Sequence, residues 1–247
     1  VHTMCIWDIA RAFSSGDRVE LCAGDWYDGC ISPLERYVIA MLLKYFEPGT
    51  VLEVGTYKGY TTRLLLENTG AGTLVYTIDL PGLSGSEEVD HATDWRLIRN
   101  TGMVAVTGDH PRAACLRRVL GNTFDASTWE KIPGGVDFAF IDASHSYEAV
   151  KNDTEHVLEK LDPDGVILWH DYGRGETTER GVGRYLRELM KSREDIFVIS
   201  DTSLGARAPA GSLRSAAARI PDFFPAGDYY QRFKKGPIPW LKADPIG

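Results

Sequence analysis

From about residue 50 onward, short apolar runs alternate with longer stretches in which apolar positions recur at helical spacing. These stretches predict helices near residues 58–68, 111–120, 145–161 and 177–191. The apolar runs predict strands at Thr50–Gly55, Thr73–Asp79, Met103–Gly108, Val136–Asp142, Val166–Asp171 and Ile196–Ser200. Strands that alternate with helices of this length form right-handed crossovers and a mostly parallel sheet. Because the strands are continuously apolar, we expect an α/β fold with helices on both faces of the sheet.

The segments on either side of this alternation predict a single domain with two extensions. Ser32, Pro33 and Glu35 predict a helix start, with Ser32 as the N-cap, Pro33 at the first helical position and Glu35 completing a capping box. We expect this helix to end near Phe46. Residues 1–48 are therefore assigned to an N-terminal helical or lid segment, 49–207 to the core and 208–247 to an irregular C-terminal tail.

A glycine turn follows the first core strand and an acid ends the second. Gly55 permits a sharp turn, and Gly59 permits a close approach between the next helix and a ligand. Asp79 is placed to accept hydrogen bonds from both hydroxyl groups of a ribose. A dinucleotide-binding turn needs further glycines where this chain has Tyr57 and Tyr60, whose bulk would block a pyrophosphate. The turn therefore favours a nucleoside-type cofactor other than a dinucleotide.

Two carboxylates follow the strands of the second half. Asp142 ends one predicted strand with His145 three residues later, and His170 and Asp171 end the next strand. With the E-x-G-x-x-x-G turn, these D-x-x-H-x-Y and H-D elements resemble class I S-adenosylmethionine-dependent O-methyltransferases. The resemblance over residues 32–207 is to the group that tailors antibiotics and macrolide sugars, and more distantly to catechol and caffeoyl-CoA O-methyltransferases. It implies a Rossmann-like, mostly parallel seven-stranded sheet.

The resemblance also implies a binding site for S-adenosylmethionine. Asp109, taken as the residue that ends the third strand, would face the adenine amino group, although it is equally suited to cap a helix. Thr61 would lie near the carboxylate of the cofactor. The cofactor-binding residues implied by the resemblance are Glu53, Gly55, Tyr57, Gly59, Thr61, Asp79 and Asp109.

By the same resemblance, Asp142 and Asp171 would hold Mg²⁺ or another divalent cation, and His145 would be the general base. Relatives often carry a second acid or amide beside the fifth-strand acid, whereas the neighbours here are His170 and Tyr172. A softer metal that uses His170, or no metal, therefore stays open. The plainer alternatives are that the two acids cap strand ends and that the histidines pack or cap.

Composition and charge exclude other classes of protein. The net charge is −8 and the basic residues are scattered, which argues against a protein that grips phosphate backbones. The four cysteines form no C-x-x-C pair, and the apolar runs are too short to span a bilayer, so we expect a cytoplasmic protein. A homo-oligomer stays open.

The predicted function is methyl transfer to a hydroxyl group of a small molecule, such as a natural product, a sugar or a catechol-like compound. Asp142 would act through the metal and His145 by accepting the proton. The alternatives are a non-catalytic protein that binds S-adenosylmethionine and a metal-independent methyltransferase that acts on another nucleophile.

Overall fold

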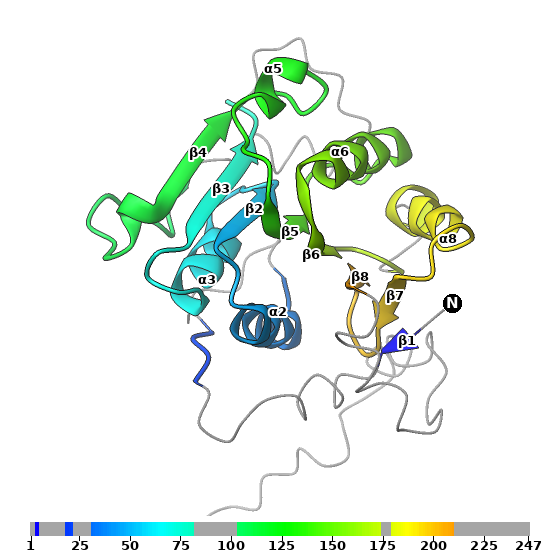
Figure 1. The fold of residues 1–247 in the computed structure, drawn as a ribbon, viewed down its shortest axis with the longest axis horizontal. Coiled ribbons are helices and arrows are strands. Elements are labelled where there is room, and N and C mark those ends of the chain that lie inside the picture. The colour runs from blue at the N-terminus through cyan, green and yellow to red at the C-terminus, as the bar shows by residue number, and fades with distance from the viewer. Residues whose placement is uncertain (1–2, 5–17, 22–30, 82–102, 174–178, 210–247) are drawn as a thin grey trace, which may run out of the picture.

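The structure is a computed structural model, and it describes residues 3–4, 18–21, 31–81, 103–173 and 179–209. One sheet runs through the described part in the strand order β1-β7-β8-β6-β5-β2-β3-β4 (Figure 1). Its strands are β1 (Thr3–Met4), β2 (Thr50–Val54), β3 (Leu74–Asp79), β4 (Leu116–Leu120), β5 (Val136–Ile141), β6 (Leu161–Trp169), β7 (Ile196–Ile199) and β8 (Gly205–Arg207). Only the pairings of β8 with β6 and β7 are antiparallel. The prediction of a mostly parallel, Rossmann-like sheet is confirmed, with the two-residue β1 added beside β7.

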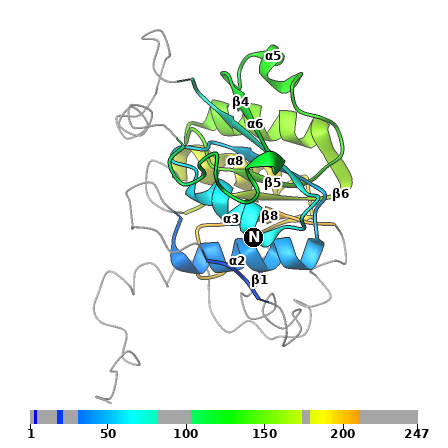
Figure 2. The same cartoon turned by 90° about the vertical axis from the view of Figure 1, so that its left-hand side faces the viewer.

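Helices cover both faces of the sheet, as predicted. Figures 1 and 2 show α2 (Pro33–Phe46) and α3 (Tyr60–Asn68) on one side, with α6 (Tyr147–Lys160) and α8 (Arg184–Leu189) on the other. Neighbouring residues of β5 point to opposite sides, so that Phe138 packs in the α2–α3 core and Ala139 in the α6–α8 core. Both side chains are fully buried, which accounts for the continuous apolar pattern of this central strand.

The helix α2 begins as its sequence predicts. The Ser32 hydroxyl accepts a hydrogen bond from the backbone N–H of Glu35 at 3.2 Å, and the Ser32 N–H donates to Glu35 Oε2 at 2.8 Å. Pro33 occupies the first turn, where its missing N–H removes no hydrogen bond. The helix ends at Phe46, and Glu47 then adopts a left-handed conformation with φ +45°. The predicted capping box and helix bounds are confirmed.

The third strand lies later in the chain than predicted. Residues 103–108 form no strand, and the predicted helix near 111–120 is instead a 3₁₀ turn, η1 (Ala113–Cys115), followed by β4. The apolar run at 103–108 predicts a buried strand, but Val104 is 59% exposed and its N–H donates to the carbonyl of Lys58. As an edge strand, β4 buries only Val119 and exposes two arginines, so its sequence lacks the apolar run of a central strand.

The second half follows the predicted order with shifted boundaries. A short helix, α5 (Ala126–Trp129), precedes β5, and α6 begins at Tyr147 with Ser146 as its N-cap. The predicted helix near 177–191 consists of a π-helical turn, η2 (Glu179–Gly183), followed by α8. The tail predicted for 208–247 lies outside the described residues from 210 onward. Within the described residues, no helix combines the length and the apolar character that crossing a membrane requires.

Candidate active site

The predicted cofactor turn and the predicted ribose-binding acid lie side by side at the carboxyl ends of β2 and β3. Asp79 Oδ2 accepts a hydrogen bond from the backbone N–H of Tyr57 at 3.0 Å, and Oδ1 accepts one from the N–H of Leu80 at 2.9 Å. Burial raises the pKa of Asp79 to about 6, although the two hydrogen bonds oppose this rise. The turn thus holds a partly desolvated carboxyl at the sheet edge where open α/β folds bind ligands.

The two motif glycines have the backbone conformations that such a turn requires. Gly55 has φ +94° and Gly59 has φ +79°. A Cβ on Gly55 would lie 2.1 Å from the carbonyl oxygen of Asp142, so the turn after β2 contacts the turn after β5 directly. A Cβ on Gly59 would instead meet the side chain of Met103, which can move. Gly55 is therefore the position where a side chain is excluded by main-chain packing.

The contacts of Glu53 and Thr61 with other described residues do not identify a ligand for either side chain. Glu53 is fully buried under the turn, where its Oε2 accepts a hydrogen bond from the hydroxyl of Thr62 at 2.5 Å. Its Oε1 has no hydrogen-bond partner among the described residues, and burial raises its pKa well above the usual value. Thr61 is half-buried in the first turn of α3. Their contacts with a cofactor stay predictions.

The prediction for Asp109 is wrong in its placement. Asp109 does not end a strand, because the third strand is β4, and its side chain accepts a hydrogen bond from Thr107 in an exposed turn. The residues that follow β4 are Gly121 and Asn122, and the N–H of Gly121 donates to the carbonyl of Asp79 at 3.0 Å. Asn122 therefore follows the third strand at the position predicted for Asp109, and its Oδ1 accepts a hydrogen bond from the N–H of Phe124 at 3.0 Å.

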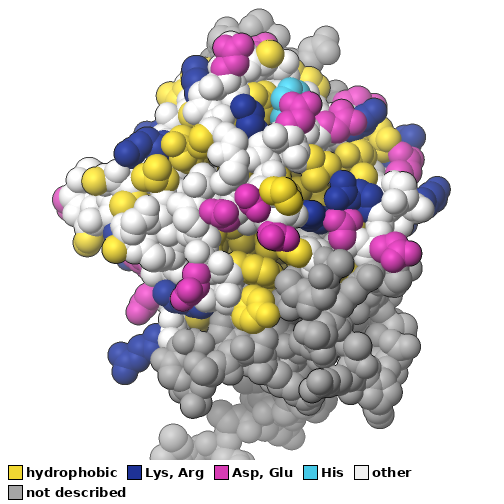
Figure 3. All heavy atoms as spheres, viewed as in Figure 1, with side chains coloured by type: hydrophobic (Ala, Val, Ile, Leu, Met, Phe, Trp, Pro, Cys, Tyr) yellow, Lys and Arg dark blue, Asp and Glu magenta, His cyan; other side chains and the backbone are white. Residues whose placement is uncertain are grey.

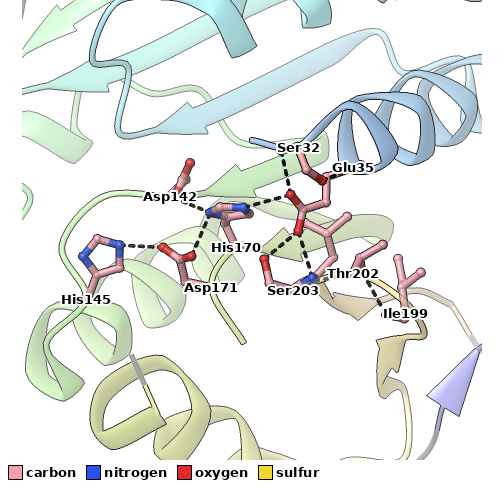
Figure 4. Close-up of polar contacts among 10 residues, drawn as sticks. Ser32, Glu35, Asp142, His145, His170, Asp171, Ile199, Thr202 and Ser203 are labelled. Carbon is pink, nitrogen blue, oxygen red and sulfur yellow. Dashed lines mark hydrogen bonds and ion pairs between the residues drawn. The ribbon is translucent and has the colours of Figure 1, made fainter. Parts of the chain in front are cut away.

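Four predicted residues lie together at the ends of β5 and β6 (Figure 4). His170 Nδ1 lies 3.1 Å from Asp142 Oδ1 and 3.4 Å from Asp171 Oδ1. The other oxygen of Asp171, Oδ2, lies 2.6 Å from His145 Nε2. Asp171 is 6% exposed and has φ +64°, a left-handed conformation that Asp adopts more readily than most residues with a side chain. The fold thus holds Asp171 between the two histidines.

Glu35, on helix α2, also belongs to this cluster. The sequence predicts only a capping role for it. Its Oε2 lies 3.4 Å from His170 Nε2, and its Oε1 accepts hydrogen bonds from the N–H and the hydroxyl of Ser203 at 2.8 and 2.6 Å. Glu35 is 3% exposed. The capping box fully accounted for an acid at this position, so no local signal distinguished it from an ordinary capping residue.

The charges of the cluster compensate one another. Burial by itself would raise the pKa of Glu35 and Asp171, but the facing histidines hold both well below their usual values. Burial would lower the pKa of His170, but the charges of Asp142 and Asp171 raise it well above the usual value. The surrounding carboxylates therefore favour a positive charge at His170, and the same carboxylates would favour a divalent cation in place of a ring proton.

The donor atoms also fit a metal ion in number and spacing. One ligand atom from each of Asp142, His170 and Asp171 lies within 4.8 Å of the others. His170 Nδ1 lies 3.1 and 3.4 Å from the two carboxylate oxygens, about the separation of adjacent ligands that bind one cation at about 2.1 Å. Two carboxylate oxygens and one imidazole nitrogen are a mixed donor set. A cavity of about 10 Å³, with room for about one water molecule, is lined by Asp142, His145, His170 and Val182. The side chains of Asp142 and His145 are 18% and 17% exposed. The cluster is therefore reachable from outside.

The surface around the described core carries interspersed charges. On the face drawn in Figure 3, Lys and Arg side chains lie singly or in pairs among acidic and neutral ones. On that face, the described residues form no broad basic patch. A strong attraction for a polyanion is not evident there.

Comparison with known proteins agrees with this site. A family profile described as a methyltransferase domain matches residues 52–172, which include the glycine turn, Asp79 and the cluster at the ends of β5 and β6. An uncharacterized protein of Acanthamoeba polyphaga mimivirus is 26% identical over 144 residues, which are 56% of this chain. The chain covers only 59% of the length of that relative.

Two solved structures share the fold. The O-methyltransferase from Bacillus cereus, in complex with SAH, has a TM-score of 0.52 and 18% identity, over 74% of this chain and 84% of that one. The O-methyltransferase TomG from Streptomyces achromogenes, involved in tomaymycin synthesis and in complex with SAM, has a TM-score of 0.52 and 16% identity. That match covers 74% of this chain and 83% of TomG. The predicted Rossmann-like fold is confirmed, and the methyltransferase-domain profile agrees with the predicted resemblance to class I O-methyltransferases.

Proposed function

We propose that this chain, whose residues 52–172 match a methyltransferase domain, transfers a methyl group from S-adenosylmethionine to a hydroxyl group of a small molecule. One observation carries the proposal. The turn from Gly55, which holds the carboxyl of Asp79, packs directly against Asp142 of the histidine–carboxylate cluster. A cofactor on that turn would have its reactive end beside groups that can bind and deprotonate a hydroxyl.

The proposed cofactor site follows the strand ends. Asp79 would accept hydrogen bonds from the ribose hydroxyls, while Glu53, Gly55, Tyr57, Gly59 and Thr61 would shape the rest of the site. We assign the adenine side to Asn122, because it follows β4 beside Asp79. Since its Oδ1 accepts the N–H of Phe124, the NH₂ group of its amide is the one that would donate to the edge of the base.

A divalent cation at Asp142, His170 and Asp171 is the second part of the proposal. The imidazole nitrogen favours a first-row transition ion, Co²⁺ more strongly than Mn²⁺, over Mg²⁺, which prefers oxygen ligands. When bound, the cation would orient the acceptor hydroxyl and lower its pKa. Asp171 would then serve twice, with Oδ1 toward the metal position and Oδ2 toward His145.

His145 is the proposed general base. The acceptor oxygen attacks the methyl carbon in line, the carbon–sulfur bond breaks, its electron pair stays on sulfur, and the hydroxyl proton passes to His145. Since His145 Nε2 contacts Asp171 at 2.6 Å, Nδ1 is the nitrogen that would take the proton. Asp171 would orient the ring and stabilise the imidazolium that forms, as the acid of a catalytic triad does.

Methyl transfer assayed against catechols, sugars and polyketide glycosides tests the proposal. We expect one class of hydroxyl compound to yield a methyl ether and S-adenosylhomocysteine in equal amounts. Calorimetry would show binding of S-adenosylhomocysteine and none of NAD. Binding without turnover on any acceptor supports the non-catalytic alternative, and turnover on amines or thiols that survives a chelator supports the metal-independent one. A small-molecule acceptor and a cytoplasmic location are parts of the proposal that composition alone supports.

A further inference from the structure

Glu35 connects three parts of the fold that are distant in sequence. It lies in the first turn of α2, and it contacts His170 after β6 and Ser203 in the turn between β7 and β8 (Figure 4). Its position is outside residues 52–172, which match the methyltransferase domain. The N-terminal helix thus contributes a buried carboxylate to the cluster.

Capping of the helix explains only part of this arrangement. A capping box needs one carboxylate oxygen to accept the N–H of Ser32, which Oε2 of Glu35 does at 2.8 Å. Capping acids are normally exposed, whereas Glu35 is 3% exposed and also receives both donors of Ser203 on Oε1. A carboxylate is buried in this way at a considerable desolvation penalty, which its contacts must offset. The contact that capping does not explain is the one with His170.

The two nitrogens of His170 face different partners. Nε2 lies 3.4 Å from Glu35 Oε2, and Nδ1 lies 3.1 Å from Asp142 Oδ1 and 3.4 Å from Asp171 Oδ1. A histidine that binds a metal through one nitrogen almost always donates the other N–H to a carboxylate, a carbonyl or water. In this cluster Glu35 stands on the side of the ring away from the two other metal-ligand candidates.

We propose that Glu35 is a positioning residue that holds the Nε2–H of His170 and thereby presents Nδ1 as the metal-binding nitrogen beside Asp142 and Asp171. The proposal rests on the metal site of the proposed function and deepens it. Ser203 and the N–H of Ser32 hold the carboxylate in turn, so that helix α2 and the β7–β8 turn fix the orientation of a metal ligand.

Titration of the full chain with Co²⁺, followed by its visible absorption and by calorimetry, tests this role. We expect Glu35→Gln to weaken Co²⁺ binding about 10- to 100-fold, the usual effect of losing a partner behind a ligand. The matched control is Ser32→Ala, which removes the N-cap hydroxyl but keeps the N–H that contacts Glu35. If Glu35 only caps α2, the two variants will lower the melting temperature alike and neither will change the Co²⁺ affinity.

Long-range ¹H–¹⁵N correlation spectra of the histidine rings supply a readout that does not depend on turnover or on any variant. In the Zn²⁺-loaded wild type we expect His170 to carry its proton on Nε2 and to bind the metal through Nδ1. Metal bound through Nε2, or no bound metal at all, overturns the proposal. Metal bound through Nδ1 in a protein that transfers no methyl group instead contradicts the proposed function and supports the role of Glu35.

Discussion

Replacing Asp79 by Asn should make the ligand-free protein more stable and its cofactor binding weaker. The carboxyl accepts the N–H groups of Tyr57 and Leu80, yet burial still raises its pKa from 3.8 to about 6. A carboxyl with a raised pKa in the folded state opposes folding wherever it is ionised. Asp79 is therefore kept at a cost to stability, which a cofactor-binding role would explain.

The size of this gain in stability and its pH dependence follow from the rise in the pKa of Asp79. Below pH 3.8 the carboxyl is protonated in both states and contributes nothing. Between pH 3.8 and 6 the unfolded chain releases the proton first, so the free energy of unfolding falls as pH rises, and above pH 6 the full penalty applies. At 1.36 kcal/mol per pKa unit the penalty is about 3 kcal/mol. Since Asn keeps only one carbonyl oxygen for two N–H donors, the net gain should be about 1–2 kcal/mol.

Urea unfolding at pH 4 and pH 8 measures this effect, and Asp164→Asn at an exposed position of β6 is the matched control. We expect Asp79→Asn to gain stability at pH 8 and not at pH 4, and Asp164→Asn to change little at either pH. Calorimetry should show S-adenosylhomocysteine binding weakened about 10- to 100-fold by Asp79→Asn, because hydrogen bonds to a charged acceptor are lost. An Asn variant that is equally destabilised at both pH values would refute the reasoning.

Three further changes probe the turn and the cluster. Gly55→Ala should lower the free energy of unfolding by about 3 kcal/mol in urea melts, since its Cβ would overlap the Asp142 carbonyl and its φ is positive, whereas Gly72→Ala, with open space around it, should stay within about 0.5 kcal/mol. His145→Ala should reduce kcat about 10²- to 10⁴-fold and leave cofactor affinity unchanged. If kcat is retained and cofactor affinity is lost, His145 binds the cofactor and is not the base. Activity should fall in EDTA and return with Mn²⁺, and full turnover in chelator would exclude the metal role. Asp171→Ala should abolish the response to Mn²⁺, measured as initial rate against metal concentration.

The central part of the fold could be predicted because its local and tertiary preferences agree. The strand β5 is apolar throughout and buried on both faces, and the glycine turn after β2 has the positive φ angles that its sequence requires. The start of α2 was equally predictable, because Ser32 and Glu35 form their capping box within four residues. Each of these features depends on contacts close in sequence or on uniform burial.

The third strand could not be predicted for the opposite reason. Residues 103–108 have the composition of a strand, but the sheet positions beside β3 are taken by β4, whose pattern is weakened by two exposed arginines at an edge. Because the third strand was predicted at 103–108, Asp109 was predicted to lie at the end of a strand that does not form. The function of Glu35 was hidden in a similar way, since its contacts with His170 and Ser203 join residues more than a hundred positions apart. Local patterns carry no information on such pairs.

The turn from Asp142 to His145 shows how two glycines fix a candidate site that contains neither of them. A Cβ on Gly55 would lie 2.1 Å from the carbonyl oxygen of Asp142, and a Cβ on Gly181 would lie 1.7 Å from that of His145. Gly55 follows β2 and Gly181 lies in the π-helical turn η2, so the main chain of the turn is enclosed from both sides. Because neither end can move without displacing a neighbouring main chain, the carboxylate and the histidine are held at a fixed separation before any ligand binds. Such preorganisation is what in-line methyl transfer demands of a protein that supplies mainly alignment and a proton acceptor.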